Sequence, residues 1–309
     1  MSEERIDISV IIACRNEAAH IGALLESLRE CVKVAGKTVE VLIADGMSDD
    51  GTREALTHFQ PGFPRLTVLP NPGRIVSTGL NAAIKAARGK VILRMDAHTN
   101  YAPDYIQRCV ETLESTGADN VGGPARTQAQ TFWGKVIATA YHSRFACGGA
   151  RFHDGDYEGY VDTVPYGCWH RETFDKIGLF DEALVRNQDD EFNLRLTRAG
   201  GKIWQSSAIR SWYSPRAAIG PLFRQYFQYG FWKVAVVRKH RLPASWRHLI
   251  PAGFVAANIS LLGFSSLAAL LDWHSSAAFF FLSWLAMITV YLAAAVFFAF
   301  VSAGKQWWM

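Results

Sequence analysis

The sequence is poor in cysteine, and its cysteines show no pairing. Five occur in 309 residues, and no two of them have a C-x-x-C spacing. They are Cys14, Cys31, Cys109, Cys147 and Cys168. An odd, scattered set of this kind indicates reduced thiols in a cytosolic domain, and it argues against a disulfide framework and a structural zinc site.

Motifs of several other enzyme classes are also missing. No G-x-S-x-G elbow is present to support a serine nucleophile, and no G-x-x-x-x-G-K loop is present to bind phosphates. The N-terminal residues MSEERIDIS contain no apolar core, so we expect no signal peptide. The chemistry therefore has to come from separate polar residues that the fold brings together.

Charge is absent from two long stretches near the C-terminus. Residues 252–271 and 277–301 contain no Asp, Glu, Lys or Arg, and about 20 apolar residues are enough to cross a bilayer as a helix. A pair of buried core helices is the alternative, but uncharged runs of this length are rare in soluble proteins. We therefore predict a transmembrane helical hairpin in residues 251–309.

The charges around these stretches predict the orientation of the hairpin. Residues 210–247 contain eight Lys or Arg and no acid, and Lys305 follows the second stretch, whereas the connecting loop has only Asp272 and His274. Because cytoplasmic flanks carry the excess of Lys and Arg, both ends of the hairpin are expected there. We therefore expect residues 1–250 on the cytoplasmic side of the inner (plasma) membrane.

Residues 220–250 are rich in both aromatic and basic side chains. This mixture suits a segment at the membrane interface, with rings at headgroup depth and cations that reach phosphate. Nucleic acid would also attract basic residues, but the position beside a membrane span favours anionic lipid or lipid-linked phosphate. We therefore expect the lipid bilayer as a partner, and no nucleic acid.

The first 125 residues alternate strand patterns with amphipathic helix patterns. Strands are expected at residues 10–13, 39–44, 66–69 and 91–95, with helices at 18–31, 80–87 and 103–117. Gly89 and Gly117 are expected to end two of these helices. The alternation predicts an α/β domain in residues 1–219, with a Rossmann-like, mostly parallel sheet. Ligands of such sheets bind beyond the carboxyl ends of the strands.

One polar cluster follows the last of these strands. Alternation in an extended chain would place Asp96, His98 and Asn100 on one face. A carboxylate, an imidazole and an amide oxygen in that arrangement would hold a divalent cation against a diphosphate. An ordinary strand end with polar caps explains the same residues equally well, so spacing alone leaves both interpretations open.

A second cluster, Gln188 followed by Asp189, Asp190 and Glu191, opens a predicted helix. Acids favour a helix N-terminus because they complement the helix dipole, which is the simpler explanation. A catalytic base at this place would need one carboxylate that faces a cleft.

Four further residues are candidate ligands. Glu17 and Asp45 follow strands, where each contacts a nucleoside or merely caps the next helix. Arg74 and Arg94 are candidate phosphate ligands, with exposure to solvent as the alternative.

The clusters in their order resemble the GT-A glycosyltransferases of family 2. The matching segments, within residues 7–235, are SVIIACRNE, EVLIADGMSDDGT, LNAAIKAARGKVILRMDAH, GCWHRETFDKIGLFDEAL and NQDDEFNLRLTRAGGKI. With the trailing SPR and FRQYFQYGFWK and the hairpin, the chain is most similar to the succinoglycan-type exopolysaccharide glucosyltransferases. The resemblance implies a UDP-sugar donor, a divalent metal (Mn²⁺ or Mg²⁺), inversion at the anomeric carbon, and an acceptor saccharide on polyprenyl diphosphate.

The resemblance also implies roles for particular residues. Cys14, Arg15 and Glu17 match the nucleotide pocket, and Asp45 matches the first of two acids that contact the base; Arg74 joins this donor-side group. Asp96 and His98 match the D-x-D that carries metal and diphosphate; Asn100 is added as a metal-ligand candidate from the strand alternation alone. Asp189 matches the base that deprotonates the acceptor hydroxyl. Acceptor-side or phosphate candidates are Gln188, Glu191, Arg216, Gln225 and Trp232.

The chain departs from the family pattern at several of these positions. Gly46 replaces the second acid of the base-binding pair, and His98 replaces the second Asp of D-x-D, which removes a negative charge from the metal site. Gln188 replaces the Glu before the base, and Trp212 and Tyr213 stand where the family often has a metal-binding His. FRQYFQYGFW matches the Q-x-x-R-W of processive synthases only loosely, which favours single addition over polymerisation.

The expected reaction is a direct displacement, in which Asp189 takes the acceptor proton and no covalent intermediate forms. One alternative enzyme transfers the sugar onto polyprenyl phosphate, which is already anionic and needs no base. Another alternative is a non-catalytic membrane scaffold that binds nucleotide sugar or lipid. Other polysaccharide-synthesis enzymes are candidate partners, while the sugar, the linkage and the oligomeric state are left open.

Overall fold

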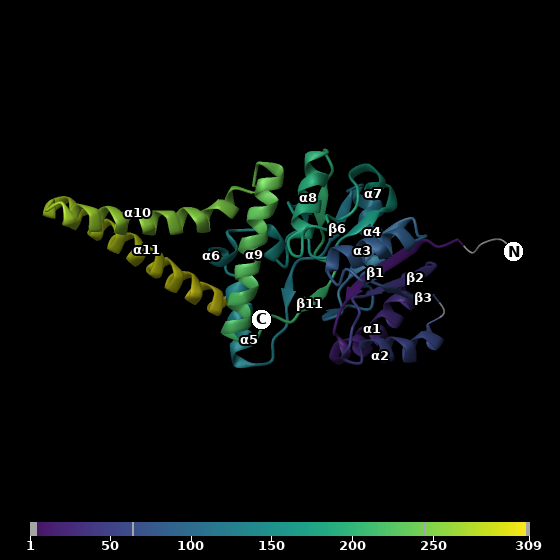
Figure 1. The fold of residues 1–309 in the computed structure, drawn as a ribbon. Helices are drawn as coiled ribbons and strands as arrows, with labels where there is room; N and C mark the ends of the chain where they lie inside the picture. The colour runs from purple at the N-terminus through teal and green to yellow at the C-terminus, as the bar shows by residue number, and fades with distance from the viewer. Residues whose placement is uncertain (1–4, 64, 244, 307–309) are drawn as a thin grey trace. The chain divides into compact units, whose positions relative to one another are not determined.

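The computed structural model describes residues 5–63, 65–243 and 245–306. Their main feature is an eight-stranded sheet with the strand order β3-β2-β1-β4-β9-β6-β10-β8 (Figure 1). Its strands are β1 (Ile8–Cys14), β2 (Val39–Asp45), β3 (Leu66–Pro70), β4 (Val91–Met95), β6 (Asn120–Gly122), β8 (Gly159–Tyr160), β9 (Cys168–His170) and β10 (Ile203–Gln205).

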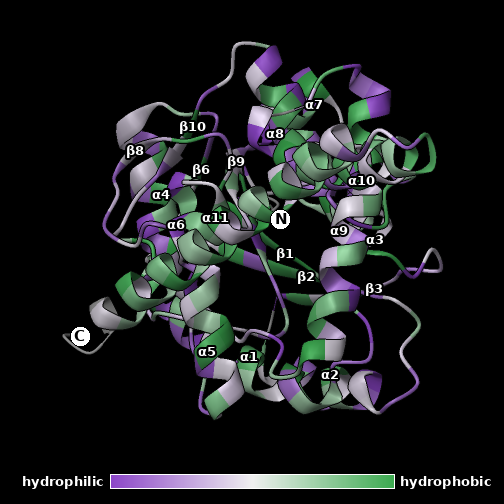
Figure 2. Ribbon diagram, turned by 90° about the vertical axis from the view of Figure 1, so that its left-hand side faces the viewer, coloured by the Kyte–Doolittle hydropathy of each residue, from purple (hydrophilic) through white to green (hydrophobic). Residues whose placement is uncertain are grey.

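The sheet is mixed, and its N-terminal half is parallel. β1 pairs in parallel with β2 and β4, and β2 pairs in parallel with β3. β9 runs antiparallel to both β4 and β6, and β8 runs antiparallel to β10. All seven residues of β2 are buried, as expected for a parallel strand that is covered on both faces. Figure 2 colours β1 and β2 as hydrophobic.

Helices cover both faces of this sheet, because alternate side chains of its strands point to opposite sides. In β1, Val10 and Ile12 join the core cluster under α1 (Ala18–Ala35), α2 (Thr52–Phe59) and α4 (Tyr105–Thr116). Ile11 joins the cluster under α3 (Val76–Ala86), α7 (Arg171–Ile177) and α8 (Gln188–Arg198). The mostly parallel α/β prediction is therefore confirmed.

An aromatic cluster fixes α8, the helix that begins with the acidic cluster. Phe192 on its inner face has its ring centroid 5.8 Å from that of Trp169 in β9 and 4.7 Å from that of Phe180. Trp169 and Phe192 are almost fully buried. Aromatic burial of this extent stabilises the position of the helix start relative to the sheet.

A second, three-stranded sheet has the order β5-β11-β7. It consists of β5 (Thr99–Tyr101), β7 (Arg126–Thr127) and β11 (Ser211–Tyr213). β11 pairs antiparallel with β5, which starts directly beyond the turn after β4. The small sheet therefore supports one side of that turn. The shorter helical elements are η1 (Gln60–Gly62), α5 (Phe132–Tyr141), α6 (Arg144–Cys147), η2 (Arg151–His153) and η3 (Trp246–Leu249).

The predicted helix ends are partly right. Gly117 ends α4 in the left-handed conformation with φ of 61°, as predicted. Gly89 does not cap α3, which ends at Ala86 with an extended residue after it, so that prediction is wrong. Gly89 is required for a different reason: a Cβ there would lie 2.5 Å from the backbone nitrogen of Ser9. All five cysteines are free, and four of them are buried.

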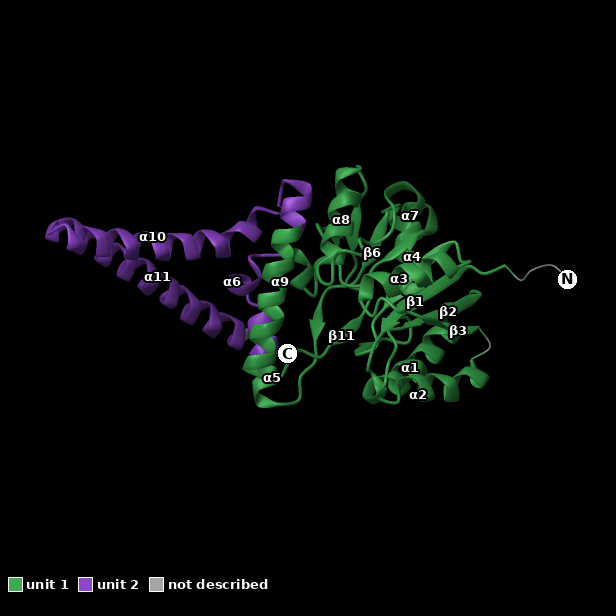
Figure 3. Cartoon of the chain, viewed as in Figure 1, with its two compact units in different colours: residues 1–135, 151–235 green, residues 136–150, 236–309 purple. Residues whose placement is uncertain are grey.

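The chain divides into two compact units (Figure 3). The first contains residues 1–135 and 151–235, and the second contains residues 136–150 and 236–309. α9 (Ile219–His240) lies in the first unit as far as Ala235.

The second unit is built around α10 (Ile250–Leu270) and α11 (His274–Gln306). By length and composition, the segments Trp246–Leu270 and His274–Gly304 are able to cross a membrane. The two helices contact each other, and Trp284 Nε1 donates a hydrogen bond to Asn258 Oδ1 at 2.8 Å between them. Their remaining surface is apolar and exposed, which suits a hairpin surrounded by lipid.

Candidate active site

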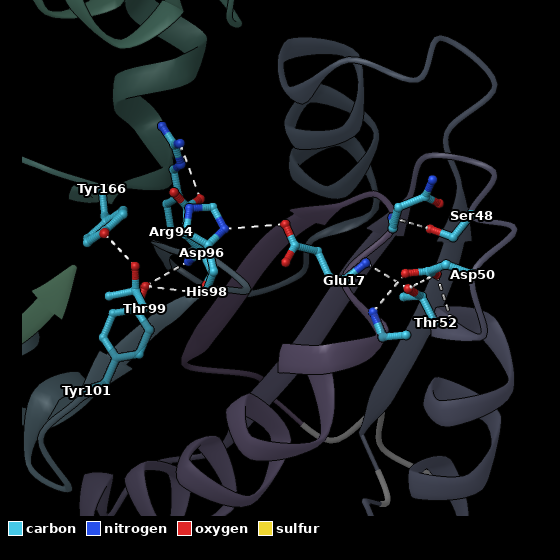
Figure 4. A network of polar contacts seen from close by, with 12 residues as sticks. Glu17, Ser48, Asp50, Thr52, Arg94, Asp96, His98, Thr99, Tyr101 and Tyr166 are labelled. Atoms are coloured by element: carbon cyan, nitrogen blue, oxygen red, sulfur yellow. Dashed lines mark hydrogen bonds and ion pairs between the residues drawn. The ribbon is translucent and has the colours of Figure 1, made fainter. Parts of the chain in front are cut away.

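The polar loops that follow β1 and β2 are tied together at the carboxyl edge of the sheet. Thr52 Oγ1 accepts a hydrogen bond from the backbone N–H of Glu17 at 2.8 Å, and Asp50 Oδ2 accepts one from the N–H of Ala18 at 3.0 Å. These bonds satisfy N–H groups at the start of α1, which have no partner inside the helix. They fix Glu17 beside the β2 loop, as Figure 4 shows.

Asp45, which the resemblance assigns to the nucleoside, lies buried at the end of β2. Its carboxylate accepts a hydrogen bond from the backbone N–H of Ser48 at 3.2 Å and forms an ion pair with Arg53 Nε at 3.4 Å. The next residue, Gly46, lies under Arg15: a Cβ at Gly46 would be 2.9 Å from Arg15 Cβ. Because Arg15 packs against position 46, a side chain there would meet Arg15, and this accounts for the absence of the second acid.

The other two donor-side candidates, Cys14 and Arg74, lie in different surroundings. Cys14 is buried, and burial raises the pKa of its thiol to about 12, so the group is neutral. Arg74 is exposed in the turn between β3 and α3, with φ of 57°. Arg74 does not line the pocket that opens between α1 and the strands β5 and β11.

The turn after β4, which contains Asp96 and His98, is not extended. The predicted alternation of its side chains is therefore wrong. β4 ends at Met95, residues 97–98 form a turn, and β5 begins at Thr99. Asp96 is held at the start of this turn, because its backbone N–H donates to the Tyr101 hydroxyl at 2.7 Å. The turn, and not strand alternation, decides where each side chain lies.

His98 and Glu17 approach each other across the site (Figure 4). The Nδ1 atom of His98 lies 3.3 Å from Glu17 Oε1. This hydrogen bond raises the pKa of His98, although burial acts in the opposite direction. Tyr213 meets the imidazole ring edge-on at 6.2 Å between centroids. Asn100 is exposed on β5, and its Nδ2 donates to Gln128 Oε1 at 3.3 Å.

The chemistry of Asp96 and His98 fits a divalent cation that takes its other ligands from a diphosphate. Both belong to one turn, and their side chains are 23% and 40% exposed. Among the residues that the structure describes, no group of three His, Cys, Asp or Glu side chains is placed to hold a metal ion. A carboxylate and an imidazole together suit Mn²⁺ better than Mg²⁺.

A pocket of about 550 Å³ opens beside this turn, between α1 and the strands β5 and β11. Its lining includes Arg15, Asn16, Glu17, His20, Asp50, His98, Asn100, Ser214 and Arg216. Arg15 and Arg216 bring permanent positive charge to it from two separate segments. The pocket therefore offers room and charge for a phosphate-bearing ligand.

Asp189, in the first turn of α8, is joined to the β4 turn by an arginine. Arg94 Nη1 donates to Asp189 Oδ1 at 2.5 Å, and Arg94 Nη2 lies 3.3 Å from Asp96 Oδ1. Arg94 is only 4% exposed, so the alternative of a solvated surface residue is wrong. Burial raises the pKa of Asp189; Arg94 opposes this effect only in part. The sequence contained one signal for this bridge, a charged residue within the apolar strand VILRM.

The neighbours of Asp189 on α8 serve other contacts. Asp190 forms an ion pair with Lys233 of α9. Glu191 is fully buried, and its carboxylate is bound by Arg195 at 3.0 Å; this burial contradicts its assignment to the acceptor side. Gln188 is also buried. Asp189 is thus the acid of this cluster that lies at the β4 turn.

α9 brings two of the predicted acceptor-side residues near the same region. Gln225 Nε2 donates to the hydroxyl of Tyr229 at 2.8 Å and lies 3.4 Å from that of Tyr213. Asn187, directly before α8, donates to the backbone oxygen of Tyr229 at 3.0 Å. Trp232 is half-buried on the same helix. α9 is therefore fastened to the N-terminal end of α8, where Asp189 lies.

Known proteins with similar sequences carry out sugar transfer. The family described as Glycosyl transferase family 2 matches residues 9–177. The chain is 35% identical to the succinoglycan biosynthesis protein ExoA of Rhizobium meliloti (strain 1021), over 85% of this chain and 78% of that protein. It is 27% identical to a dolichyl N-acetyl-alpha-D-glucosaminyl phosphate 3-beta-D-2,3-diacetamido-2,3-dideoxy-beta-D-glucuronosyltransferase of Methanococcus voltae, over 82% of this chain and 81% of that one.

The fold also has a solved counterpart. The mannosyltransferase PcManGT from Pyrobaculum calidifontis, in complex with GDP-Man and Mn²⁺, superposes with a TM-score of 0.60 at 17% identity. The superposition covers 99% of this chain and 88% of that one. This likeness confirms the GT-A fold. From its sequence, the protein belongs to glycosyl transferase family 2.

Proposed function

We propose that the protein is a membrane-bound inverting glycosyltransferase, which moves a sugar from a UDP-sugar to a saccharide on polyprenyl diphosphate. The observation that carries this proposal is the bridge from Asp96 through Arg94 to Asp189. In this proposal, the two acids that contact one guanidinium group are a donor-side carboxylate and the base. An inverting displacement uses one group for the leaving diphosphate and another for the attacking hydroxyl, because these lie on opposite sides of the anomeric carbon.

The residues of this site divide the work of a direct displacement. Asp189 accepts the proton of the acceptor hydroxyl, and at the same time the oxygen of that hydroxyl bonds to the anomeric carbon. The bond from that carbon to the diphosphate oxygen breaks at the same time, and the nucleotide leaves with the electron pair. Arg15 and Arg216, which line the pocket, are proposed to bind the departing phosphates.

A divalent cation held by Asp96 and His98 would supply positive charge to the leaving diphosphate. The pair offers one oxygen and one nitrogen ligand in the same turn. The presence of Mn²⁺ in the structure of PcManGT is in line with this proposal.

The acceptor is proposed to be lipid-linked, because α9 has a surface suited to the membrane interface. Phe223, Phe227 and Phe231 recur every four residues and are 62–72% exposed, so they form one stripe. Gln225 and Lys233, which contact the catalytic unit, lie on the other side of the helix. Aromatic rings on one face with basic residues nearby are typical of interfacial helices.

The proposed location is the inner membrane, with residues 1–250 in the cytoplasm. Support comes from the two apolar helices and from the excess of Lys and Arg before them. The relatives named for succinoglycan biosynthesis and for a dolichyl-linked acceptor are in line with this setting.

The proposal is tested by supplying detergent-purified protein with a panel of UDP-, GDP- and TDP-sugars and divalent metals. We expect nucleotide release and transfer to a polyprenyl-diphosphate-linked saccharide from a UDP-sugar, with inversion at the anomeric carbon seen by NMR. Transfer only to polyprenyl phosphate would favour the alternative enzyme. Binding of donors without any turnover would favour the scaffold.

A further inference from the structure

Arg94 is a buried charge in the strand that carries the donor-side turn. Its neighbours in β4 are apolar and buried, and the guanidinium is almost fully removed from solvent. Its backbone is fixed as well, because its N–H donates to the oxygen of Gly167 at 3.0 Å. A buried arginine is stable only if its charge is paired, and here the partners are two acids 93 residues apart in sequence.

The geometry of the guanidinium suits contact with both of these acids. Nη1 is bound to Asp189 and Nη2 faces Asp96, so one planar fork serves both carboxylates. Figure 4 shows Arg94 beside Asp96 at the end of β4. A lysine ammonium is a compact point charge on a flexible stem and cannot reproduce a two-armed contact of this kind.

Two other roles for Arg94 agree less well with its surroundings. A phosphate ligand needs to reach the open pocket, but Arg94 is 4% exposed and is not part of the pocket lining. A purely structural ion pair would have no reason to join the two carboxylates that the proposed reaction uses. Arg195, which pairs with the buried Glu191 and donates to the oxygen of Leu179, is an ion pair of that structural kind on the same helix.

On the basis of the proposed function, we infer that Arg94 is a positioning residue that acts through Asp189. It holds the Asp189 carboxylate aimed at the acceptor hydroxyl, and it fixes this base relative to the donor-side Asp96. Without Arg94, the carboxylates of Asp96 and Asp189 would lose the cation that both of them contact. Arg94 itself touches neither the sugar nor the acceptor.

The test is a double-mutant cycle on the full chain in detergent, with the transfer rate and the donor KM as readouts. Arg94→Met should lower kcat by at least about 10-fold, and by no more than Asp189→Asn does. The donor KM should stay nearly unchanged. In the Asp189→Asn background, Arg94→Met should cause little further loss, because the group it positions is already gone. Arg94→Lys should recover part of the rate.

Arg195→Met is the matched control, since it removes the partner of a different carboxylate of α8, the buried Glu191. Its effect on kcat should be the same factor in both backgrounds. If Arg94→Met fails to fold in thermal melts, Arg94→Lys takes its place in the cycle and should again lose less in the Asp189→Asn background.

Two results would overturn the inference. One is an equal loss of rate for the Arg94 variants with and without Asp189. The other is a rise in donor KM that accounts for the loss, which would place Arg94 on the donor. A wild-type protein without transfer activity would instead contradict the proposed function.

Discussion

His98 is the residue at which the proposed metal site departs from the D-x-D pattern that the family resemblance implies. It stands in the place of an acid, and its Nδ1 is near Glu17 rather than near another carboxylate of the turn. The sequence was sufficient to predict Asp96, His98 and Asp189 as candidates, because each occupies a recognisable motif. The partner of Asp189 was not predictable, since the contact with Arg94 depends on how β4 and α8 meet.

We predict that transfer with Mn²⁺ equals or exceeds transfer with Mg²⁺, because imidazole is a better ligand for transition metals than for magnesium. His98→Asp should shift the ratio of the two rates toward Mg²⁺ by several-fold. The measurement is the initial rate over a titration of each metal, with His20→Asp as the control at a second histidine of the pocket lining. Full activity in excess EDTA would refute the metal assignment.

At the scale of elements, β1, β2 and β4 are apolar runs that the structure buries on both faces, and these runs were readable from the sequence. The ends of the elements were harder to predict, and Gly89 is an example. The residue before it, Arg88, is held by Glu40 in β2, which accepts hydrogen bonds from Ser9 Oγ and from the backbone N–H of Arg88, each at 2.6 Å. This buried carboxylate draws the α3–β4 loop against β1, and so the glycine is needed for close approach and not for capping.

Glu40→Gln should lower the free energy of unfolding by about 1–3 kcal/mol, because buried donors lose their charged acceptor. Burial by itself raises the pKa of Glu40, but the hydrogen bonds from Ser9 and Arg88 outweigh it, and the pKa is lowered overall. The stabilisation is therefore complete above the unfolded-state pKa, and it is lost as the pH falls through the lower folded-state value.

Chemical unfolding of both proteins at several pH values measures this difference. The gap between wild type and Glu40→Gln should be constant near neutral pH and should narrow below about pH 4. Glu54→Gln, at an exposed acid of α2, is the control and should change stability little. A gap that widens on acidification would contradict this reading of Glu40.

At the scale of the whole molecule, composition alone separated a polar α/β part from a C-terminal part with two uncharged stretches. The described residues include two helices there, Trp246–Leu270 and His274–Gly304, that are long and apolar enough to cross a membrane. The aromatic and basic segment that contains α9 was recognisable from its residues, but its helical structure and its attachment to α8 were not. That attachment uses Lys233 and Asp190, and no motif in the sequence indicates such a pair. The proposed base, Asp189, lies in the same helical turn as Asp190.

This turn provides a matched pair of acids for the central claim. Asp189 and Asp190 are adjacent, each is partly exposed, and each is paired with one cation, Arg94 or Lys233. Only Asp189 is joined through its cation to the donor-side turn. A difference between the two isosteric Asn variants therefore reports the chemistry of the base and not the general effect of removing an acid from the start of α8.

The most direct measurement is the transfer rate and UDP-sugar affinity of the wild type, Asp189→Asn and Asp190→Asn in the full-length protein, with thermal melts to confirm folding. We predict that Asp189→Asn lowers transfer at least about 100-fold, the lower bound typical of general-base catalysis, with donor affinity almost unchanged. Asp190→Asn should keep the rate within a few-fold of wild type. Near-normal transfer by a folded Asp189→Asn protein would contradict the account.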